Sequence, residues 1–158
     1  MKNKLTFLAL LIFVITSMSF AQPYYVSTTG NDGNLGTFGS PWLTIHHAVI
    51  TVPASSTIRV MPGSYDLSGS PSPGAAIDIA QALTLVANDW VGSSNNTTTT
   101  LVGVDVKAID IRITSADVTI QGFTIDFDGA GTRAIGAIEI NGNPNLQNVH
   151  ILNNRIYL

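Results

Sequence analysis

The 158-residue chain contains no cysteine, so no disulfide can stabilise it. Small secreted domains often depend on disulfides, and this chain must rely on burial and backbone pairing instead. Charged residues make up only 11% of the chain, and acidic residues outnumber basic ones. A partner such as nucleic acid or an anionic membrane would require a basic face, so the sequence predicts neither.

Long hydrophobic runs are also missing, since a membrane-spanning helix needs about 18 or more apolar residues. The apolar run Leu5–Val14 is shorter and follows two lysines. It precedes Ser19–Ala21, which has the small residues that a signal peptidase requires before its cleavage site. This pattern predicts a signal peptide over residues 1–21 and a secreted or cell-surface protein, with no membrane span. The mature chain then has five basic and ten acidic residues. Its length suits one domain with a modest core.

An internal repeat is present in what remains. The segment Ala76–Ile79 reads AIDI and recurs as AIDI at Ala108–Ile111 and as AIEI at Ala137–Ile140. A second short alternating segment follows each copy: Leu83–Leu85, Val118–Ile120 and Val149–Ile151. Alternation of apolar and polar residues with a period of two is typical of strands with one buried face.

Repeats of about 30 residues with such short strands cannot bury their own apolar faces, whereas stacked repeats can. Equivalent strands would then pair in parallel, with isoleucine, valine and leucine in columns inside. Gly122, Asn153 and Asn154 fall where the chain must bend between strands, a role that suits these residue types. The sequence therefore predicts an all-β fold, a right-handed parallel β-helix, over residues 57–158.

The open end of such a stack would expose unpaired backbone and apolar side chains, so it needs a cover. Residues 22–56 are predicted to supply it as a cap of strand, loop and helix. Tyr24–Val26 is the expected leading strand, and Pro41–Ile50 the expected capping helix, with Ser40 as its N-cap. The cap loop reads GNDGN at Gly30–Asn34. It resembles a fragment of a calcium loop, but we interpret it as a turn.

The stretch YYVSTTGNDGNLGTFGSPWLTIHHAV and the later TIRVMPGSYD, within Tyr24–Asp66, resemble a known amino-terminal signature. It is that of secreted right-handed parallel β-helix proteins of the pectin-lyase-like superfamily. The segments VTIQGFTI and VHILNNRI are similar to the generic repeat of that superfamily. The resemblance is specific for architecture. It leaves activity open, because fold does not fix function.

The resemblance implies a protein that acts on or binds extracellular polysaccharide. An enzyme of this kind would be a polysaccharide lyase or a glycoside hydrolase. Family lyases use a lysine or arginine base beside an acidic calcium cluster, and family hydrolases use grouped aspartates with a G-H-G-type turn. The sequence contains neither constellation, so the chain is expected to be inactive alone. The alternative is a non-catalytic surface, adhesin-type or structural repeat protein.

A metal site is the sharper hypothesis from the repeat itself. Asp78, Asp110 and Glu139 occupy the same place in the three AIDI-type segments, so they are expected to point outward in one column about 4.8 Å apart. Their mutual repulsion, roughly 1 kcal/mol per pair in a water-like dielectric, could be offset by Ca²⁺. Arg112, two residues after Asp110, could neutralise the column instead.

The chain ends at Leu158, in the middle of a repeat strand. Terminal repeats ordinarily carry a cap, so the sequence predicts a β-helix that is truncated at its C-terminus. The open C-terminal coil is expected to self-associate when the chain is expressed alone.

Overall fold

The computed structural model describes residues 22–67, 75–90, 98–103, 109–126, 138–141 and 146–157. The predicted signal peptide lies outside these residues. Within the described ranges, no helix is both long enough and apolar enough to cross a membrane.

The described chain is built mainly from strands, which form three parallel sheets. Sheet 1 contains, in spatial order, β1 (Tyr24–Val26), β2 (Ser56–Val60), β5 (Leu83–Ala87), β8 (Val118–Gln121) and β11 (Val149–Leu152). Sheet 2 contains β3 (Gly63–Asp66), β6 (Thr99–Val102), β9 (Thr124–Asp126) and β12 (Arg155–Tyr157). Sheet 3 contains β4 (Ala75–Ile79), β7 (Ile109–Ile113) and β10 (Ile138–Ile140).

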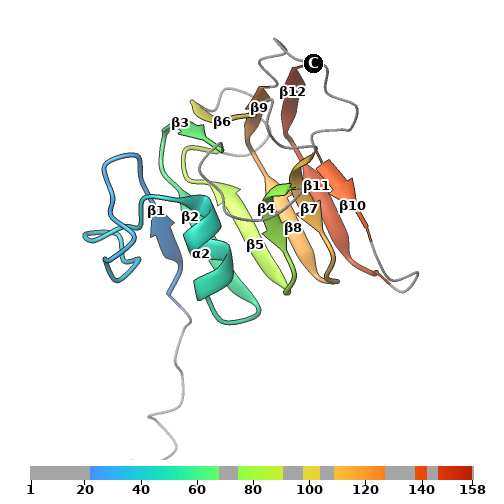
Figure 1. Cartoon of the computed structure of the whole chain (residues 1–158), viewed down its shortest axis with the longest axis horizontal. Helices are drawn as coiled ribbons and strands as arrows, with labels where there is room; N and C mark the ends of the chain where they lie inside the picture. Colours follow the sequence, from blue (N-terminus) through green and yellow to red (C-terminus); the bar gives the residue numbers. More distant parts are fainter. Residues whose placement is uncertain are drawn as a thin grey trace, which may run out of the picture.

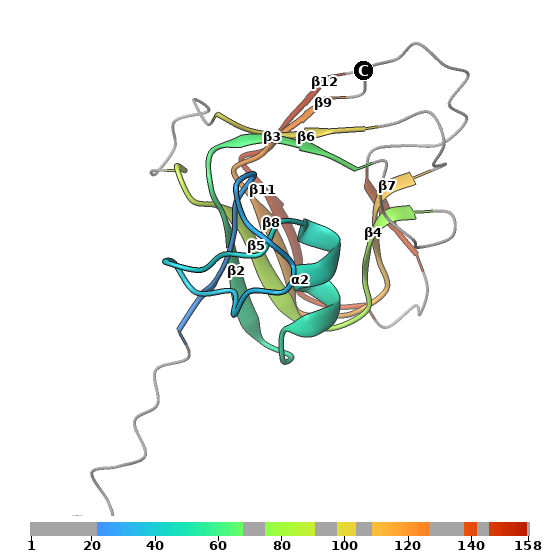
Figure 2. The ribbon, with the colours of Figure 1, turned by 60° about the vertical axis from the view of Figure 1, so that its left-hand side comes forward.

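The chain visits the three sheets in turn, so that β2, β3 and β4 form the first coil and β5, β6 and β7 the second. Strands β8, β9 and β10 form the third coil, and β11 and β12 continue into a fourth. Figure 1 shows the coils stacked one after another, and Figure 2 shows the three sheets as the sides of one coil. The predicted parallel β-helix is confirmed.

The core is a stack of inward-facing apolar side chains in register. Ile58 on β2 pairs with Leu85 on β5, which pairs with Ile120 on β8, and all three side chains are fully buried. Each such burial contributes roughly 1.5–3 kcal/mol. On β2 and β8 the sequence neighbours of these residues are partly exposed, as the period-two alternation predicts, whereas Val86 beside Leu85 on β5 is buried as well.

The bend between β8 and β9 is fixed by a side chain from the next coil. Oδ1 of Asn154 accepts a hydrogen bond from the backbone N–H of Phe123 at 2.9 Å, and its Nδ2 donates to the carbonyl of Ile120 at 3.0 Å. Gly122 and Asn153 adopt positive φ angles of 83° and 54°. The predicted bend at these residues is confirmed.

Helix α2 (Ile45–Thr51) lies across the opening that the three sheets enclose (Figure 2). It packs against β4, β1 and β2 and buries Ile45, Ala48 and Val49. The capping helix and the leading strand β1 were both predicted correctly.

The predicted start of the helix, at Pro41 after an N-cap at Ser40, is wrong. Thr44 is the N-cap, and its hydroxyl accepts from the backbone N–H of His47 at 3.1 Å. Trp42 instead forms a parallel bridge with Val26 at the end of β1. The residues before Thr44 therefore extend the cap alongside the leading strand.

Candidate functional site

Sheet 3 carries a column of charged residues on its outward face. Asp78 on β4 pairs in register with Arg112 on β7, and Arg112 pairs with Glu139 on β10. The column therefore alternates carboxylate, guanidinium and carboxylate over three successive rungs.

This register corrects one prediction. Asp110 was expected between Asp78 and Glu139, but Arg112, two residues later in β7, occupies that position. A shift of two residues keeps Ile111 and Ile113 of β7 facing inward, because side chains alternate with a period of two. The shifted register also replaces like-charge contacts by opposite-charge contacts. The three predicted metal ligands thus do not form one column.

The guanidinium of Arg112 forms an ion pair with Asp78, and both side chains are 25% exposed. Its Nη2 donates to Oδ2 of Asp78, and its Nε lies 3.4 Å from Oδ1. The hydrogen bond to Asp78 raises the pKa of Arg112 above its usual value, and the negative charges of Asp78 and Glu139 act in the same direction. Arg112 therefore stays charged and suits binding rather than proton abstraction.

Glu139 is the third member of the column, and the two oxygens of its carboxylate differ in their hydrogen bonding. Its Oε1 accepts from Nδ2 of Asn141 at 3.2 Å. Among the described side chains, Oε2 of Glu139 and Nε1 of Trp90 are the buried polar atoms that lack a hydrogen-bond partner. The column thus contains one buried acceptor whose hydrogen-bonding capacity the described side chains leave unused.

No three His, Cys, Asp or Glu side chains lie close enough to share a metal ion within the described part of the chain. Calcium binding by Asp78, Asp110 and Glu139 stays a prediction, and its original reason, repulsion within a file of carboxylates, does not apply to the observed register.

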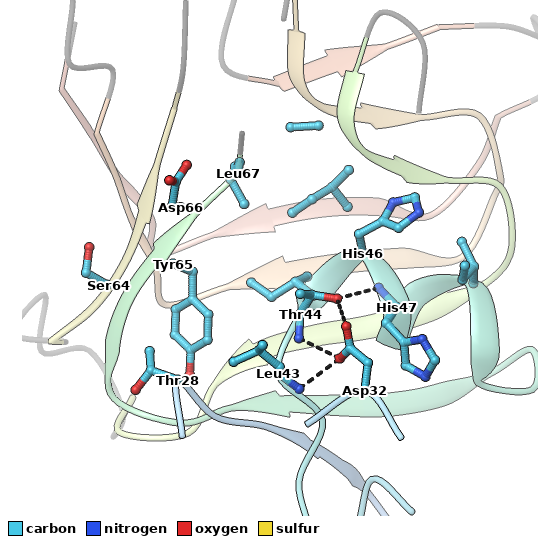
Figure 3. A pocket seen from close by; sticks show the side chains of 14 residues that line it. Thr28, Asp32, Leu43, Thr44, His46, His47, Ser64, Tyr65, Asp66 and Leu67 are labelled. Carbon is cyan, nitrogen blue, oxygen red and sulfur yellow. Dashed lines mark hydrogen bonds between the residues drawn. The ribbon is translucent and has the colours of Figure 1, made fainter. Parts of the chain in front are cut away.

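A second candidate site is a pocket of about 490 Å³ between α2 and the first coil. Its apolar part comes from Ile45 on the helix, from Tyr65 and Leu67 in and beside β3, and from Ala76 and Ile77 on β4. Its polar rim is formed by Thr28, Asp32, Thr44, His46, His47, Ser64 and Asp66 (Figure 3). Pockets of this size accommodate small ligands or short segments of chain.

Asp32 connects the cap loop to the start of α2 at the rim of the pocket (Figure 3). Its Oδ1 accepts the backbone N–H groups of Leu43 and Thr44, each at 2.9 Å, and its Oδ2 accepts the Thr44 hydroxyl at 2.8 Å. Partial burial alone would raise the pKa of Asp32, but the hydrogen bonds from Thr44 and Leu43 outweigh it and lower the pKa. The interpretation of this loop as a turn is consistent with these contacts, since Asp32 anchors backbone.

Tyr65 forms part of the pocket wall, with its hydroxyl buried at the far end of the ring. The hydroxyl donates to the carbonyl of Met61 at 2.8 Å. Burial raises the pKa of Tyr65 to about 12, so the phenol stays neutral. The ring therefore offers the pocket an apolar face.

The sequence interpretation did not identify this pocket. Its residues come from the cap loop, α2, β3 and β4, and no motif links them. One signal was available: Leu43 and Ile50 add apolar residues beside the helix face that already buries Ile45, Ala48 and Val49. Both are exposed at the pocket, Ile50 by 63%.

Comparisons with known proteins bear on the capped end of the chain. No match to the chain was found among the curated proteins or among the solved structures. A family model described as "Protein of unknown function (DUF1565)" matches residues 28–73, a range that includes α2, β2 and β3. That family is associated with β-helix proteins, and the chain is similar to it over its cap and first coil.

Proposed function

We propose that the chain is the amino-terminal part of a secreted β-helix protein of the pectin-lyase-like type, which binds or acts on extracellular polysaccharide. The capped parallel β-helix and the family match over the cap support the architectural part of this proposal. The predicted signal peptide supports secretion.

The charged column on sheet 3 is the observation that carries the binding function. Sugar hydroxyls both donate and accept hydrogen bonds, so they complement a surface that holds carboxylates and a guanidinium side by side. Bonds to ionised groups are the stronger ones. Oε2 of Glu139, beside Arg112, is buried and has no hydrogen-bond partner among the described residues, so the column of Asp78, Arg112 and Glu139 has hydrogen-bonding capacity that its own side chains do not use.

Affinity electrophoresis of the chain in gels that contain single polysaccharides tests this function. The panel includes neutral glucans and xylans together with pectate and alginate, each with and without Ca²⁺. We expect retardation by at least one polysaccharide, and Glu139→Gln should weaken it about tenfold, or ~1.4 kcal/mol. The matched control is Asp126→Asn, which removes one negative charge from the outward face of sheet 2 and should leave retardation unchanged.

Enzymatic action is tested on the same panel by the release of reducing ends and by the ultraviolet absorbance of unsaturated uronates. Release by the wild-type chain that Glu139→Gln abolishes would identify a catalytic protein. Retardation without release would identify a binding protein. No retardation by any polysaccharide would contradict the proposal.

The alternative function, a non-catalytic surface or structural repeat protein, is favoured by a different observation. Large apolar side chains are exposed on the strands at the far edge of each sheet: Ile140, Ile151, Leu152, Ile156 and Tyr157. Exposed strand edges and apolar side chains together promote association. We propose that a second copy of the chain packs on the edge that β10, β11 and β12 form, as an assembling repeat protein requires.

A further inference from the structure

The three strands of the first coil are covered differently by the cap. In sheet 1, β1 pairs with β2 and continues the sheet. In sheet 3, β4 lies against α2. In sheet 2, β3 is the last strand, and within the described part of the chain β6 is its one strand partner.

Along β3, the backbone N–H and C=O groups of successive residues point alternately toward β6 and toward the opposite side of the strand. The N–H of Gly63 donates to the carbonyl of Thr98, and that of Leu67 donates to Val102, each at 3.2 Å. In a parallel ladder, every second residue directs its N–H and C=O toward the same neighbour. The backbone N–H of Ser64 therefore points away from β6, and Ser64 lines the pocket beside α2.

The other wall of the pocket is apolar and partly exposed. Leu43 and Ile50 reach it from the helix side, while the helix buries a separate face on the solenoid. A groove with a strand edge on one side and apolar side chains on the other is the arrangement that binds an extended peptide by strand addition.

The charge of the rim selects among extended peptides. Asp32 and Asp66 bring carboxylates to the pocket, His46 and His47 are the basic side chains beside them, and no lysine or arginine is found among the described residues that line it. Complementary charge favours a basic partner.

We propose that the groove between α2 and β3 binds an extended, basic segment of another polypeptide, which adds to the edge of β3 as a further strand. The backbone of β3 supplies the hydrogen bonds, the apolar wall takes alternate side chains, and the carboxylates of the rim attract lysine or arginine. This interaction uses the capped end of the chain and is independent of polysaccharide binding on sheet 3.

The test uses fluorescence anisotropy of a short labelled peptide in which valine alternates with lysine and threonine. A second peptide replaces each lysine by glutamate, and a third carries N-methyl groups at alternate positions. We expect the chain to bind the first peptide at least tenfold more tightly than either of the others. No binding of the lysine peptide up to millimolar concentration would overturn the proposal.

Two variants at one position separate backbone from side-chain recognition. Ser64→Pro removes the N–H that points away from β6 and leaves the ladder to β6 intact, since proline is tolerated on edge strands. Ser64→Ala keeps the N–H and removes the hydroxyl. Ser64→Pro should weaken binding at least tenfold and Ser64→Ala should not, whereas equal binding by the two variants would overturn strand addition.

A second pair of variants tests the groove independently of Ser64, in case Ser64→Pro does not fold. Ile50→Lys places a cation in the groove, and Thr51→Lys places the same charge one residue further on, at a position that does not line it. We expect at least a tenfold loss with Ile50→Lys alone, and equal effects would overturn the proposal. Binding of a cello-oligosaccharide that Ser64→Ala abolishes would show a sugar site in this groove and would also overturn it.

Discussion

Trp90 packs directly against the backbone of Gly122 on the neighbouring coil. A Cβ atom at Gly122 would lie 2.6 Å from Cβ and Cγ of Trp90, closer than any real contact. Gly122 also adopts a φ of 83°, which L side chains rarely adopt. The tight bend after β8 and the packing of Trp90 therefore both require glycine at this position.

Gly122→Ala should lower the free energy of unfolding by about 2–4 kcal/mol, because left-handed backbone strain and overpacking add. The measurement is urea unfolding followed by tryptophan fluorescence and circular dichroism. Gly39→Ala is the matched control, since a Cβ at Gly39 would meet nothing within 4 Å. Equal unfolding midpoints for the two variants would contradict the role of Trp90 and Gly122.

Asp32→Asn should destabilise the cap by about 1 kcal/mol at pH 7, because charge-assisted hydrogen bonds to Leu43 and Thr44 become neutral ones. The pKa of Asp32 is lowered in the folded chain. Its contribution is therefore present above the unfolded pKa of about 3.9 and is lost as the pH falls through the lower folded value. The stability difference between wild type and variant should shrink below about pH 4. A difference that is constant from pH 7 to pH 2 would contradict this role.

The prediction of the repeat was right, and the register it implied in sheet 3 was wrong, for one physical reason. Burial of Ile111 and Ile113 fixes which face of β7 points inward, but a slip of two residues leaves that face unchanged. Apolar alternation alone therefore cannot choose between Asp110 and Arg112 as the neighbour of Asp78. The charges decide between the two registers, because opposite charges on adjacent strands are favoured over like charges.

The cap shows a similar division between local pattern and long-range contact. Helical spacing of apolar residues predicted a helix over the end of the coils. Its start depended on Asp32, which accepts the backbone N–H groups of Leu43 and Thr44 from eleven and twelve residues away. The pocket depended on the fold, which brings residues of the cap loop, α2, β3 and β4 together. The contacts of Asp32 leave no local signal in the sequence, and the pocket leaves only the apolar residues Leu43 and Ile50 beside the buried face of the helix.

The pair of Asp78 and Arg112 should show a coupling energy of about 0.5–1 kcal/mol in a double-mutant cycle with Asp78→Asn and Arg112→Gln. Both side chains are 25% exposed, so solvent screens part of the attraction. The coupling should fall when the salt concentration is raised. A coupling of zero at low salt would contradict a stabilising role for the register.

Calcium binding on sheet 3 has a direct test in thermal unfolding. Because Arg112 separates Asp78 from Glu139, we expect millimolar Ca²⁺ to leave the Tm of the wild-type chain unchanged. A rise in Tm that Mg²⁺ does not produce and Glu139→Gln abolishes would support the metal site instead. Binding to the folded state must raise the Tm, so the measurement separates the two cases.

Self-association should depend on the inward-facing isoleucines of the last coil. Ile151 continues the column of Ile120, which is fully buried, yet Ile151 is 37% exposed. Ile156 stands in the same relation to the buried Ile125. Packing a second copy on this coil would bury these side chains, and each would then contribute part of the 1.5–3 kcal/mol of a core residue.

Ile151→Glu should therefore shift the chain from oligomer to monomer at micromolar concentration, as measured by light scattering coupled to size-exclusion chromatography. The matched control is His150→Glu, one residue earlier on β11, whose side chain is exposed on the outward face of sheet 1. Both variants introduce a glutamate on the same strand, and only Ile151→Glu places it on the apolar surface between copies. If both variants stay oligomeric, the association surface lies elsewhere. A monodisperse monomer of the wild-type chain would show that the last coil does not bind a second copy. This result would contradict the proposal of an assembling repeat protein.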